Sequence, residues 1–198
     1  MKLSDREFNA MNHPVRRWIQ RVYEWPILRR MGLEPAGRDV LEIGCGSGYG
    51  GELIAKRNPH RYVGIDLMGE QIGLARERGL ERCEFIQGDV ADLSALPDQS
   101  FDLVVDFGSL HHVPAWKKAV AESVRVLKPG GLFLVEEPEG AFLQRFDRVF
   151  HWGHPEGALF SEKDFEAGLT SLGLTIEKQQ RAFGFFWVSA RKDEPTRA

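Results

Sequence analysis

The sequence has only two cysteines, Cys45 and Cys83, and no apolar run long enough to cross a bilayer. Two cysteines exclude a disulfide framework and a cysteine-rich zinc site, and they are typical of a reducing compartment. The N-terminal residues are charged where a secretory signal would be apolar. These absences predict a soluble, cytoplasmic protein without a transmembrane segment.

Long blocks of like charge are also absent. The 198 residues carry 26 Lys and Arg against 29 Asp and Glu, for a formal net charge of −3. A nucleic-acid-binding surface needs a broad basic field, so this balance disfavours a nucleic-acid partner. The length suits one domain with a full hydrophobic core.

From residue 39 onward, short β-rich runs alternate with helical stretches. This alternation predicts a mostly parallel sheet covered by helices on both faces, a doubly wound Rossmann-like α/β fold. Strands are expected at 39–44, 61–66, 83–89, 101–107, 131–137, 174–180 and 183–191. A helix is expected to open at Ser161, with Asp164 three residues later as a capping partner.

Residues 1–38 are expected to form an N-terminal helical cap on a main domain of residues 39–198. Helical character begins at Val15, and Pro26 is expected to interrupt it, because proline removes an amide donor. Residues 138–160 are expected to be an irregular insertion that covers the substrate.

The stretch VLEIGCGSGYGG, residues 40–51, places a glycine-rich loop directly after the first expected strand. Such a loop lets the backbone approach a nucleotide closely, and the helix after it offers unpaired amides. Gly46, Gly48 and Gly51 also spell the dinucleotide fingerprint G-x-G-x-x-G, so NAD is one candidate. Asp66, at the end of the second strand, suits ribose hydroxyls in either kind of nucleotide.

Electrostatics favour S-adenosylmethionine over NAD. Glu42, just before the loop, would repel a dianionic pyrophosphate and attract a sulfonium and an α-ammonium group. Asp89, after the third strand, is placed to accept from an adenine amino group. No tyrosine is followed four residues later by lysine, the pair expected of one type of dehydrogenase.

Five ordered motifs carry a resemblance to a known family: VLEIGCGSGYG, YVGIDLM, FIQGDVADL with FDLVV, LHHV, and RVLKPGGLFLVEEP. Together they resemble the class I S-adenosylmethionine-dependent methyltransferases, particularly the ubiquinone, menaquinone and small-molecule branch. The resemblance implies a seven-stranded sheet whose last strand is antiparallel, and it implies S-adenosylmethionine as the cofactor. The cofactor-binding residues implied in this way are Glu42, Gly44, Cys45, Gly46, Gly48, Asp66, Leu67, Asp89, Val90 and Phe107.

His111 and His112 follow the fourth strand, where an acceptor would meet the methyl group. A hydroxyl or C–H acceptor must lose a proton, and histidine suits that task. We expect one of these histidines to be the base, oriented by Glu136, Glu137 or Glu139. The alternative, that the histidines only cap the next helix or pack the loop, stays open.

Two further patterns concern the covering segments. His151 and His154, with Glu156 nearby, have a spacing that could bind a metal, but Gly153 and Pro155 break the helix this would need, so no metal is expected. Phe142, Phe146 and Phe150 recur at helical spacing, which indicates a helix on the core or an aromatic-lined acceptor pocket.

Residues 12–38 contain six arginines and two glutamates. Such a surface is usually solvated. It could also grip an anionic acceptor or, beside Trp18 and Trp25, make peripheral contact with anionic lipid.

The sequence therefore predicts an enzyme that methylates a small, apolar or aromatic acceptor, with the methylated atom (O, N or C) undetermined. Two alternatives stay open: methylation of a protein or RNA, and a non-catalytic module that only binds S-adenosylmethionine. The oligomeric state does not follow from the sequence.

Overall fold

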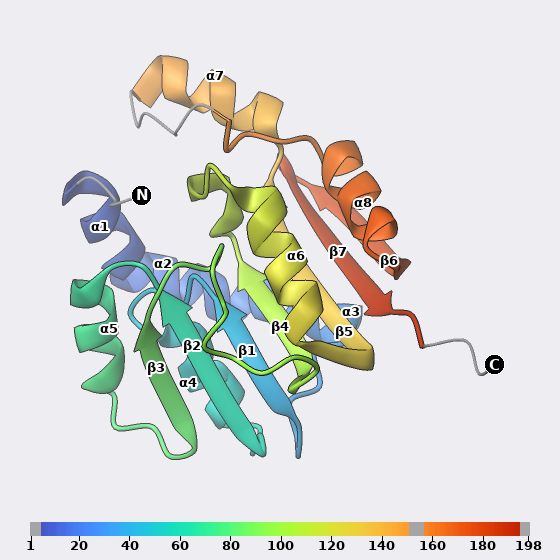
Figure 1. Cartoon of the computed structure of the whole chain (residues 1–198). Helices are drawn as coiled ribbons and strands as arrows, with labels where there is room; N and C mark the ends of the chain where they lie inside the picture. The colour runs from blue at the N-terminus through green and yellow to red at the C-terminus, as the bar shows by residue number, and fades with distance from the viewer. Residues whose placement is uncertain (1–4, 151–156, 195–198) are drawn as a thin grey trace.

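A computed structural model of the chain describes residues 5–150 and 157–194. Seven strands form one sheet in the order β3-β2-β1-β4-β5-β7-β6 (Figure 1). Strands β1 to β5 pair in parallel, and β7 lies antiparallel between β5 and β6. The predicted Rossmann-like fold with an antiparallel last strand is therefore confirmed. The strands are β1 (Asp39–Ile43), β2 (Arg61–Asp66), β3 (Cys83–Gln87), β4 (Phe101–Phe107), β5 (Leu127–Pro138), β6 (Leu174–Ala182) and β7 (Phe185–Lys192).

Helices cover both faces of the sheet, as the apolar strands require. The α-helices are α1 (Asp5–Asn12), α2 (Pro14–Ile19), α3 (Trp25–Met31), α4 (Tyr49–Ala55), α5 (Gly69–Arg76), α6 (Trp116–Val126), α7 (Gly140–Phe150) and α8 (Glu162–Ser171). Two short segments are a π-helix, η1 (Gln20–Glu24), and a 3₁₀-helix, η2 (Leu110–His112). Helices α3, α4 and α5 pack one apolar cluster against the sheet, and α6 and α8 pack the other.

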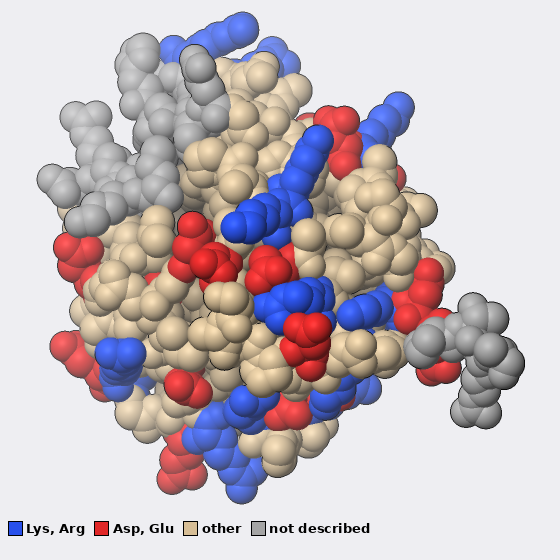
Figure 2. Space-filling model, viewed as in Figure 1, with Lys and Arg blue, Asp and Glu red and all other residues tan. Residues whose placement is uncertain are grey.

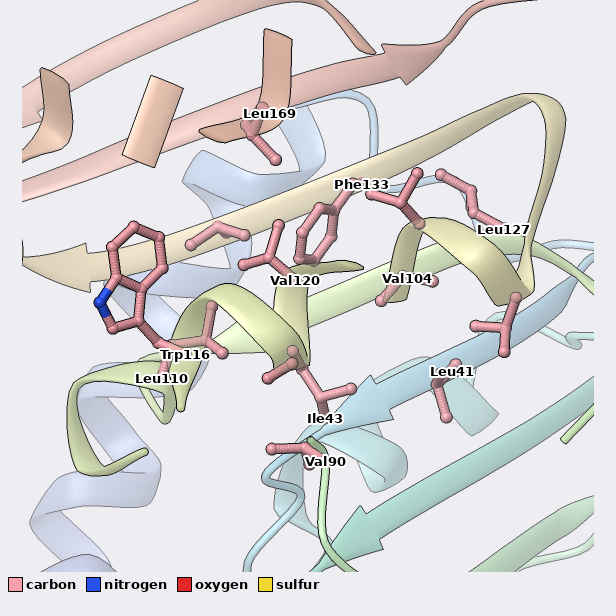
Figure 3. Packing of buried hydrophobic residues seen from close by; sticks show 14 of the residues in the cluster. Leu41, Ile43, Val90, Val104, Leu110, Trp116, Val120, Leu127, Phe133 and Leu169 are labelled. Carbon is pink, nitrogen blue, oxygen red and sulfur yellow. The ribbon is translucent and has the colours of Figure 1, made fainter. Parts of the chain in front are cut away.

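The cluster under α6 and α8 is shown in Figure 3. Trp116 and Val120 of α6 and Leu169 of α8 lie over Ile43, at the end of β1, and Phe133 of β5. Burial of this apolar surface stabilises the fold and fixes the strand ends that carry the polar residues.

The expected interruption at Pro26 is wrong. The chain stays helical through Pro26, which occupies the first turn of α3, where a missing amide donor costs nothing. The change occurs in helix type instead, because the wider π-turn of η1 precedes α3.

The segment after β5 is less irregular than expected. Residues 140–150 form α7, and α8 opens with the predicted capping box, in which the Asp164 amide donates to Ser161 Oγ and the Ser161 amide to the Asp164 carboxylate. Helices α1 and α7 both lie beyond the carboxyl ends of the parallel strands (Figure 1). In open α/β sheets ligands bind at this edge.

Candidate functional site

The glycine loop between β1 and α4 is held by the carboxylate at the end of β2. The Gly46 amide donates to Asp66 Oδ2 at 2.9 Å, and the Met68 amide donates to Asp66 Oδ1 at 2.8 Å. Burial raises the pKa of Asp66, and these two amide bonds oppose the shift. Asp66 therefore shapes the loop and also faces the cavity beside it.

Two glycines of the loop region show why side chains are excluded there. Gly46 has φ +51°, and a Cβ on it would meet nothing within 4 Å, so the space above it is open. At Gly50, by contrast, there is no space for a side chain, because a Cβ there would lie 2.4 Å from Glu42 Oε1. The loop thus leaves room for a ligand above Gly46 and packs α4 against the Glu42 carboxyl.

Glu42 is a buried carboxyl group beneath this loop. It accepts a hydrogen bond of 2.6 Å from the Tyr62 hydroxyl. Burial, opposed in part by the Tyr62 bond and reinforced by the carboxylates of Asp106 and Asp66, raises the pKa of Glu42 to about 8. At neutral pH Glu42 is therefore mostly protonated until a cation approaches, which the sequence did not indicate.

Three adjoining cavities lie at this edge of the sheet. The loop cavity, of about 120 Å³, lies against Gly44, Gly46 and Asp66. The β2–β3 cavity, of about 320 Å³, lies beside Asp89. The aromatic cavity, of about 370 Å³, lies under α7. His112 lines all three, so it stands where they meet.

Nine of the ten residues expected to bind the cofactor line these cavities. The loop cavity is lined by Glu42, Gly44, Cys45, Gly46, Asp66 and Phe107, and the β2–β3 cavity by Gly44, Asp66, Leu67, Asp89 and Val90. Gly48 lines none of the three. It caps α4 with φ +75°, and a Cβ there would lie 2.9 Å from Phe85, so its role is conformational.

The polar atoms of these cavities suit S-adenosylmethionine. Buried atoms at the loop cavity that lack a hydrogen-bond partner among the described residues include the acceptors Gln71 Oε1 and Asn12 Oδ1 and the donor Arg17 Nε. An amino-acid moiety would supply a donor and an acceptor to them, since it carries an ammonium and a carboxylate. Asp66 and Asp89 add hydrogen-bond acceptors for hydroxyl and amino groups. The polar groups that line the cavities therefore fit this cofactor.

Several of these residues were missed by sequence reasoning. Gln71 lies on α5, and Arg17 and Gln20 lie on the N-terminal segment, far in sequence from the loop whose cavity they line. The only available signal was the local excess of arginine in residues 12–38. It indicated a charged surface without showing which arginine faces inward.

The aromatic cavity is lined mainly by apolar side chains. The rings come from Tyr23, Phe107, Phe142, Phe185 and Trp187, with Met11, Ile19, Pro138 and Leu143 between them. Polar groups line it at Arg16, Glu24, His111, His112 and Glu136. Such a space holds an apolar or aromatic molecule and presents one polar end to it.

At that polar end, His111 pairs with Glu137. His111 Nδ1 lies 2.8 Å from Glu137 Oε2, and Glu137 Oε1 accepts from the Leu110 amide at 2.6 Å. Burial raises the pKa of Glu137 to about 7, although a hydrogen bond from Asp106 lowers it. Burial and the neighbouring Glu137 raise the pKa of Asp106 well above its usual range.

The other two candidate orienting carboxyls have different partners. Glu136 accepts from Trp187 Nε1 at 2.8 Å, and Glu139 Oε2 accepts from the Glu162 amide at 3.1 Å. Burial and the neighbouring Glu24 raise the pKa of Glu136 well above its usual range. Of the three expected candidates, the structure brings Glu137 to His111.

Glu24 links the N-terminal segment to this end of the cavity. Both its carboxylate oxygens accept from Arg16, at 2.6 and 2.7 Å. Burial nevertheless raises the pKa of Glu24. Because Arg16 also lines the loop cavity, this ion pair lies between the two spaces.

Among residues 5–150 and 157–194, no group of three or more His, Cys, Asp or Glu side chains could hold a metal ion. His151, His154 and Glu156 lie outside the described residues, as do the side chains of Phe146 and Phe150. No helix in the described part of the chain is long and apolar enough to cross a membrane. On the face shown in Figure 2, basic and acidic side chains are interspersed, without a broad field of one sign.

Comparison with known proteins agrees with this geometry. Residues 41–135 match the model of a family described as a methyltransferase domain. A fatty-acid O-methyltransferase from Mycolicibacterium smegmatis is 42% identical over 100 residues, covering 50% of this chain and 36% of that protein. A phthiotriol/phenolphthiotriol dimycocerosates methyltransferase from Mycobacterium tuberculosis is 38% identical over 99 residues, covering 49% of this chain and 36% of that protein. The match thus spans little more than a third of each relative.

Among solved structures, an S-adenosylmethionine-dependent methyltransferase from Aquifex aeolicus superposes with a TM-score of 0.76. The superposition covers 96% of this chain and 99% of that one, at 21% sequence identity. The chain therefore shares the fold of S-adenosylmethionine-dependent methyltransferases. Its residues 41–135, just under half of the chain, match the methyltransferase-domain family.

Proposed function

We propose that this protein methylates a hydroxyl group on a neutral, lipid-like amphiphile. The observation that carries the proposal is the position of His112, which lines the two cavities suited to the cofactor and the aromatic cavity beside them. A molecule in the aromatic cavity would meet the methyl group there.

Binding of the cofactor would involve both the sheet edge and the N-terminal segment. Arg17 would hold its carboxylate and Gln71 its ammonium, with the adjacent Glu42 compensating the positive charge once ionised. Asp66 would accept from the ribose hydroxyls and Asp89 from the adenine amino group, with Leu67 and Val90 against the base. S-adenosylmethionine supplies an electrophilic methyl group on a sulfonium centre.

The apolar lining of the aromatic cavity supports an acceptor with a hydrocarbon or aromatic body. Phe142 and Leu143 of α7 cover the cavity, and Phe185 and Trp187 of β7 lie along it. The names of the two relatives, one for fatty acids and one for phthiotriol dimycocerosates, are consistent with a lipid-like acceptor.

The charges around the cavity favour a neutral acceptor over an anionic one. Glu24 and Glu136 both line it, and the one guanidinium there, Arg16, is already paired with Glu24 among the described residues. A carboxylate acceptor would therefore meet two carboxyl groups and no unpaired guanidinium among the described residues that line the cavity. A hydroxyl group meets no such penalty.

A hydroxyl acceptor must lose its proton as its oxygen attacks, and in this proposal His111 receives that proton. The resulting imidazolium would be stabilised by Glu137, whose carboxylate fixes the ring through Nδ1. In this account His111 is the catalytic base, Glu137 its orienting partner, and His112 a positioning residue between cofactor and acceptor. Residues 5–38 and α7 then act as covers that exclude water.

The proposal is tested with a matched set of long-chain acceptors: a primary alcohol, the acid and the amine of equal chain length, and a phenol. Mass spectrometry would follow methylated product, and S-adenosylhomocysteine release would follow turnover. We expect the alcohol or the phenol to be methylated well ahead of the acid. Preference for the acid or the amine would overturn the acceptor assignment.

Protein and RNA acceptors belong in the same assay, because they are the rival substrates. Methyl incorporation into macromolecules alone would favour that alternative. Binding of S-adenosylmethionine with no transfer to any acceptor would favour a non-catalytic binding module.

A further inference from the structure

The segment from Pro14 to Glu24 is amphipathic in the opposite sense to an ordinary surface helix. Trp18 is 63% exposed and Val22 46% exposed, whereas Gln20 and Glu24 are only 7% and 5% exposed. A helix on a soluble protein normally buries its apolar stripe and exposes its polar one. Here the apolar stripe faces outward.

The inward polar stripe is explained by the cavities beneath it. Gln20 lines the loop cavity and Glu24 the aromatic cavity. The outward stripe consists of Val15, Trp18, Ile19 and Val22, at the spacing i, i+3, i+4, i+7. Ile19 also lines the aromatic cavity, but Val15, Trp18 and Val22 line none of the three cavities.

A second exposed apolar group lies beside this stripe, at the turn between β6 and β7. Phe183 is 85% exposed and holds a left-handed backbone, φ +51°. Its ring centroid is 6.3 Å from that of Tyr23, which belongs to η1 and lines the aromatic cavity. The stripe and the turn therefore form one surface next to that cavity, which we call the apolar rim: Val15, Trp18, Ile19, Val22 and Phe183.

Basic residues predominate in the segment that carries most of the apolar rim. Between His13 and Tyr23 the sequence has three arginines and no acidic residue, although the chain as a whole is acidic. Arg16 is paired with Glu24 and Arg17 lines the loop cavity, whereas Arg21 is exposed. Arg145 and Arg148 are exposed on α7, which covers the aromatic cavity. Exposed aromatic and aliphatic groups with adjacent arginines are the chemistry of a helix that lies in an anionic lipid surface.

We propose that the apolar rim inserts into the headgroup region of an anionic bilayer. Charge complementarity selects this partner over a second copy of the chain, because two copies meeting here would bring their arginines together. The aromatic cavity would then open at the membrane, so a lipid-like acceptor could enter without crossing water. Only this entry route rests on the proposed function; docking itself does not.

The test is flotation of the full chain with vesicles, without cofactor or acceptor. Vesicles of equal parts phosphatidylcholine and phosphatidylglycerol are compared with pure phosphatidylcholine. We expect binding to the anionic vesicles, weakened at high salt. The double variant Trp18→Ser with Phe183→Ser should lower vesicle affinity by about tenfold or more, because both aromatic groups leave the interface. Arg21→Glu should lower it as well.

Matched control variants distinguish binding through the apolar rim from nonspecific binding of the chain to vesicles. Leu74→Ser with Leu172→Ser removes two exposed leucines elsewhere on the chain, and Arg57→Glu reverses an exposed charge after α4. Both should leave vesicle binding unchanged. Calorimetric binding of S-adenosylmethionine should also be unchanged in the Trp18 and Phe183 double variant, which shows that it is folded.

Absence of binding to anionic vesicles, or equal binding by the double variant, would overturn the proposal. So would a wild-type dimer in solution that the double variant converts to a monomer, because the rim would then be a subunit interface. Vesicle binding without methylation of any lipid acceptor would leave the docking surface in place and count against the proposed function alone.

Discussion

His111 Nδ1 lies 2.8 Å from Glu137 Oε2, at the polar end of a cavity lined by aromatic rings. Both partners occupy strand ends: η2 follows β4, and Glu137 lies near the end of β5. A histidine held by a buried carboxylate is suited to take up a proton, since the carboxylate stabilises the imidazolium.

His111→Asn should lower turnover on a hydroxyl acceptor by about 100-fold or more, with the dissociation constant of S-adenosylmethionine within twofold of wild type. His112→Asn should instead alter both cofactor affinity and acceptor KM, because His112 lines all three cavities. Calorimetry measures the cofactor affinity of each variant, and steady-state kinetics measure its turnover and acceptor KM. If the double variant His111→Ala with His112→Ala kept full turnover, no base would be needed at this position.

Glu137 gives the same pair a pH signature. Its pKa is raised to about 7, so the carboxylate that stabilises the imidazolium is lost as the pH falls below 7. We expect kcat/KM of the wild type to rise as the pH increases through 7. The variant Glu137→Gln should not show this rise. Glu139→Gln, which alters a carboxyl bonded to the Glu162 amide, should keep it. An unchanged profile in Glu137→Gln would contradict the assignment.

Asp66→Ala should weaken S-adenosylmethionine binding at least about tenfold, because two ribose hydroxyls would lose their acceptor. The variant also frees the amides of Gly46 and Met68, so we expect a lower melting temperature. Asp92→Ala is the matched control, since Asp92 also accepts from a backbone amide two residues on but lines none of the three cavities. Unaltered affinity in Asp66→Ala would overturn the ribose assignment.

Cofactor affinity should depend on pH through Glu42. In the free protein its pKa is raised to about 8, so it is protonated at pH 7. A cationic ligand favours the ionised form and lowers that pKa, so binding releases a proton below pH 8 and affinity rises between about pH 6 and 8. Calorimetry in buffers of different ionisation enthalpy measures the proton release. Glu42→Gln should abolish it, whereas Glu84→Gln, on the exposed side of β3, should not.

Arg17→Met should weaken S-adenosylmethionine binding by about tenfold, because the methionine carboxylate would lose a charged donor. Decarboxylated S-adenosylmethionine lacks that group, so its affinity should be the same in wild type and variant. Arg21→Met is the control, since Arg21 lines none of the three cavities. Equal weakening of both ligands would place Arg17 elsewhere than at the carboxylate.

The sheet was predictable because its signals are local. Apolar strands such as β4 and the loop glycines around Gly46 are read from adjacent residues, and the order of motifs then implies the topology. The positions of Asp66 and Asp89 were predictable in the same way, since Asp66 ends β2 and Asp89 lies two residues after β3.

The N-terminal contribution was not predictable in this way. Gln20, Glu24 and Arg17 face inward because of tertiary packing over the cavities, and their apolar neighbour Trp18 is consequently turned outward. No periodicity in the sequence says which stripe of a helix meets the sheet when both stripes contain polar and apolar residues. The predicted helix interruption at Pro26 was wrong for a related reason. The position of Pro26 in the first turn of α3 depends on the π-turn before it.

The most direct test of the central claim is calorimetric titration of the protein with S-adenosylmethionine, S-adenosylhomocysteine and NAD. We expect the protein to bind the two sulfur compounds with micromolar dissociation constants and not to bind NAD. Binding of NAD in their place would return the glycine loop to a dinucleotide-binding role and contradict methyl transfer.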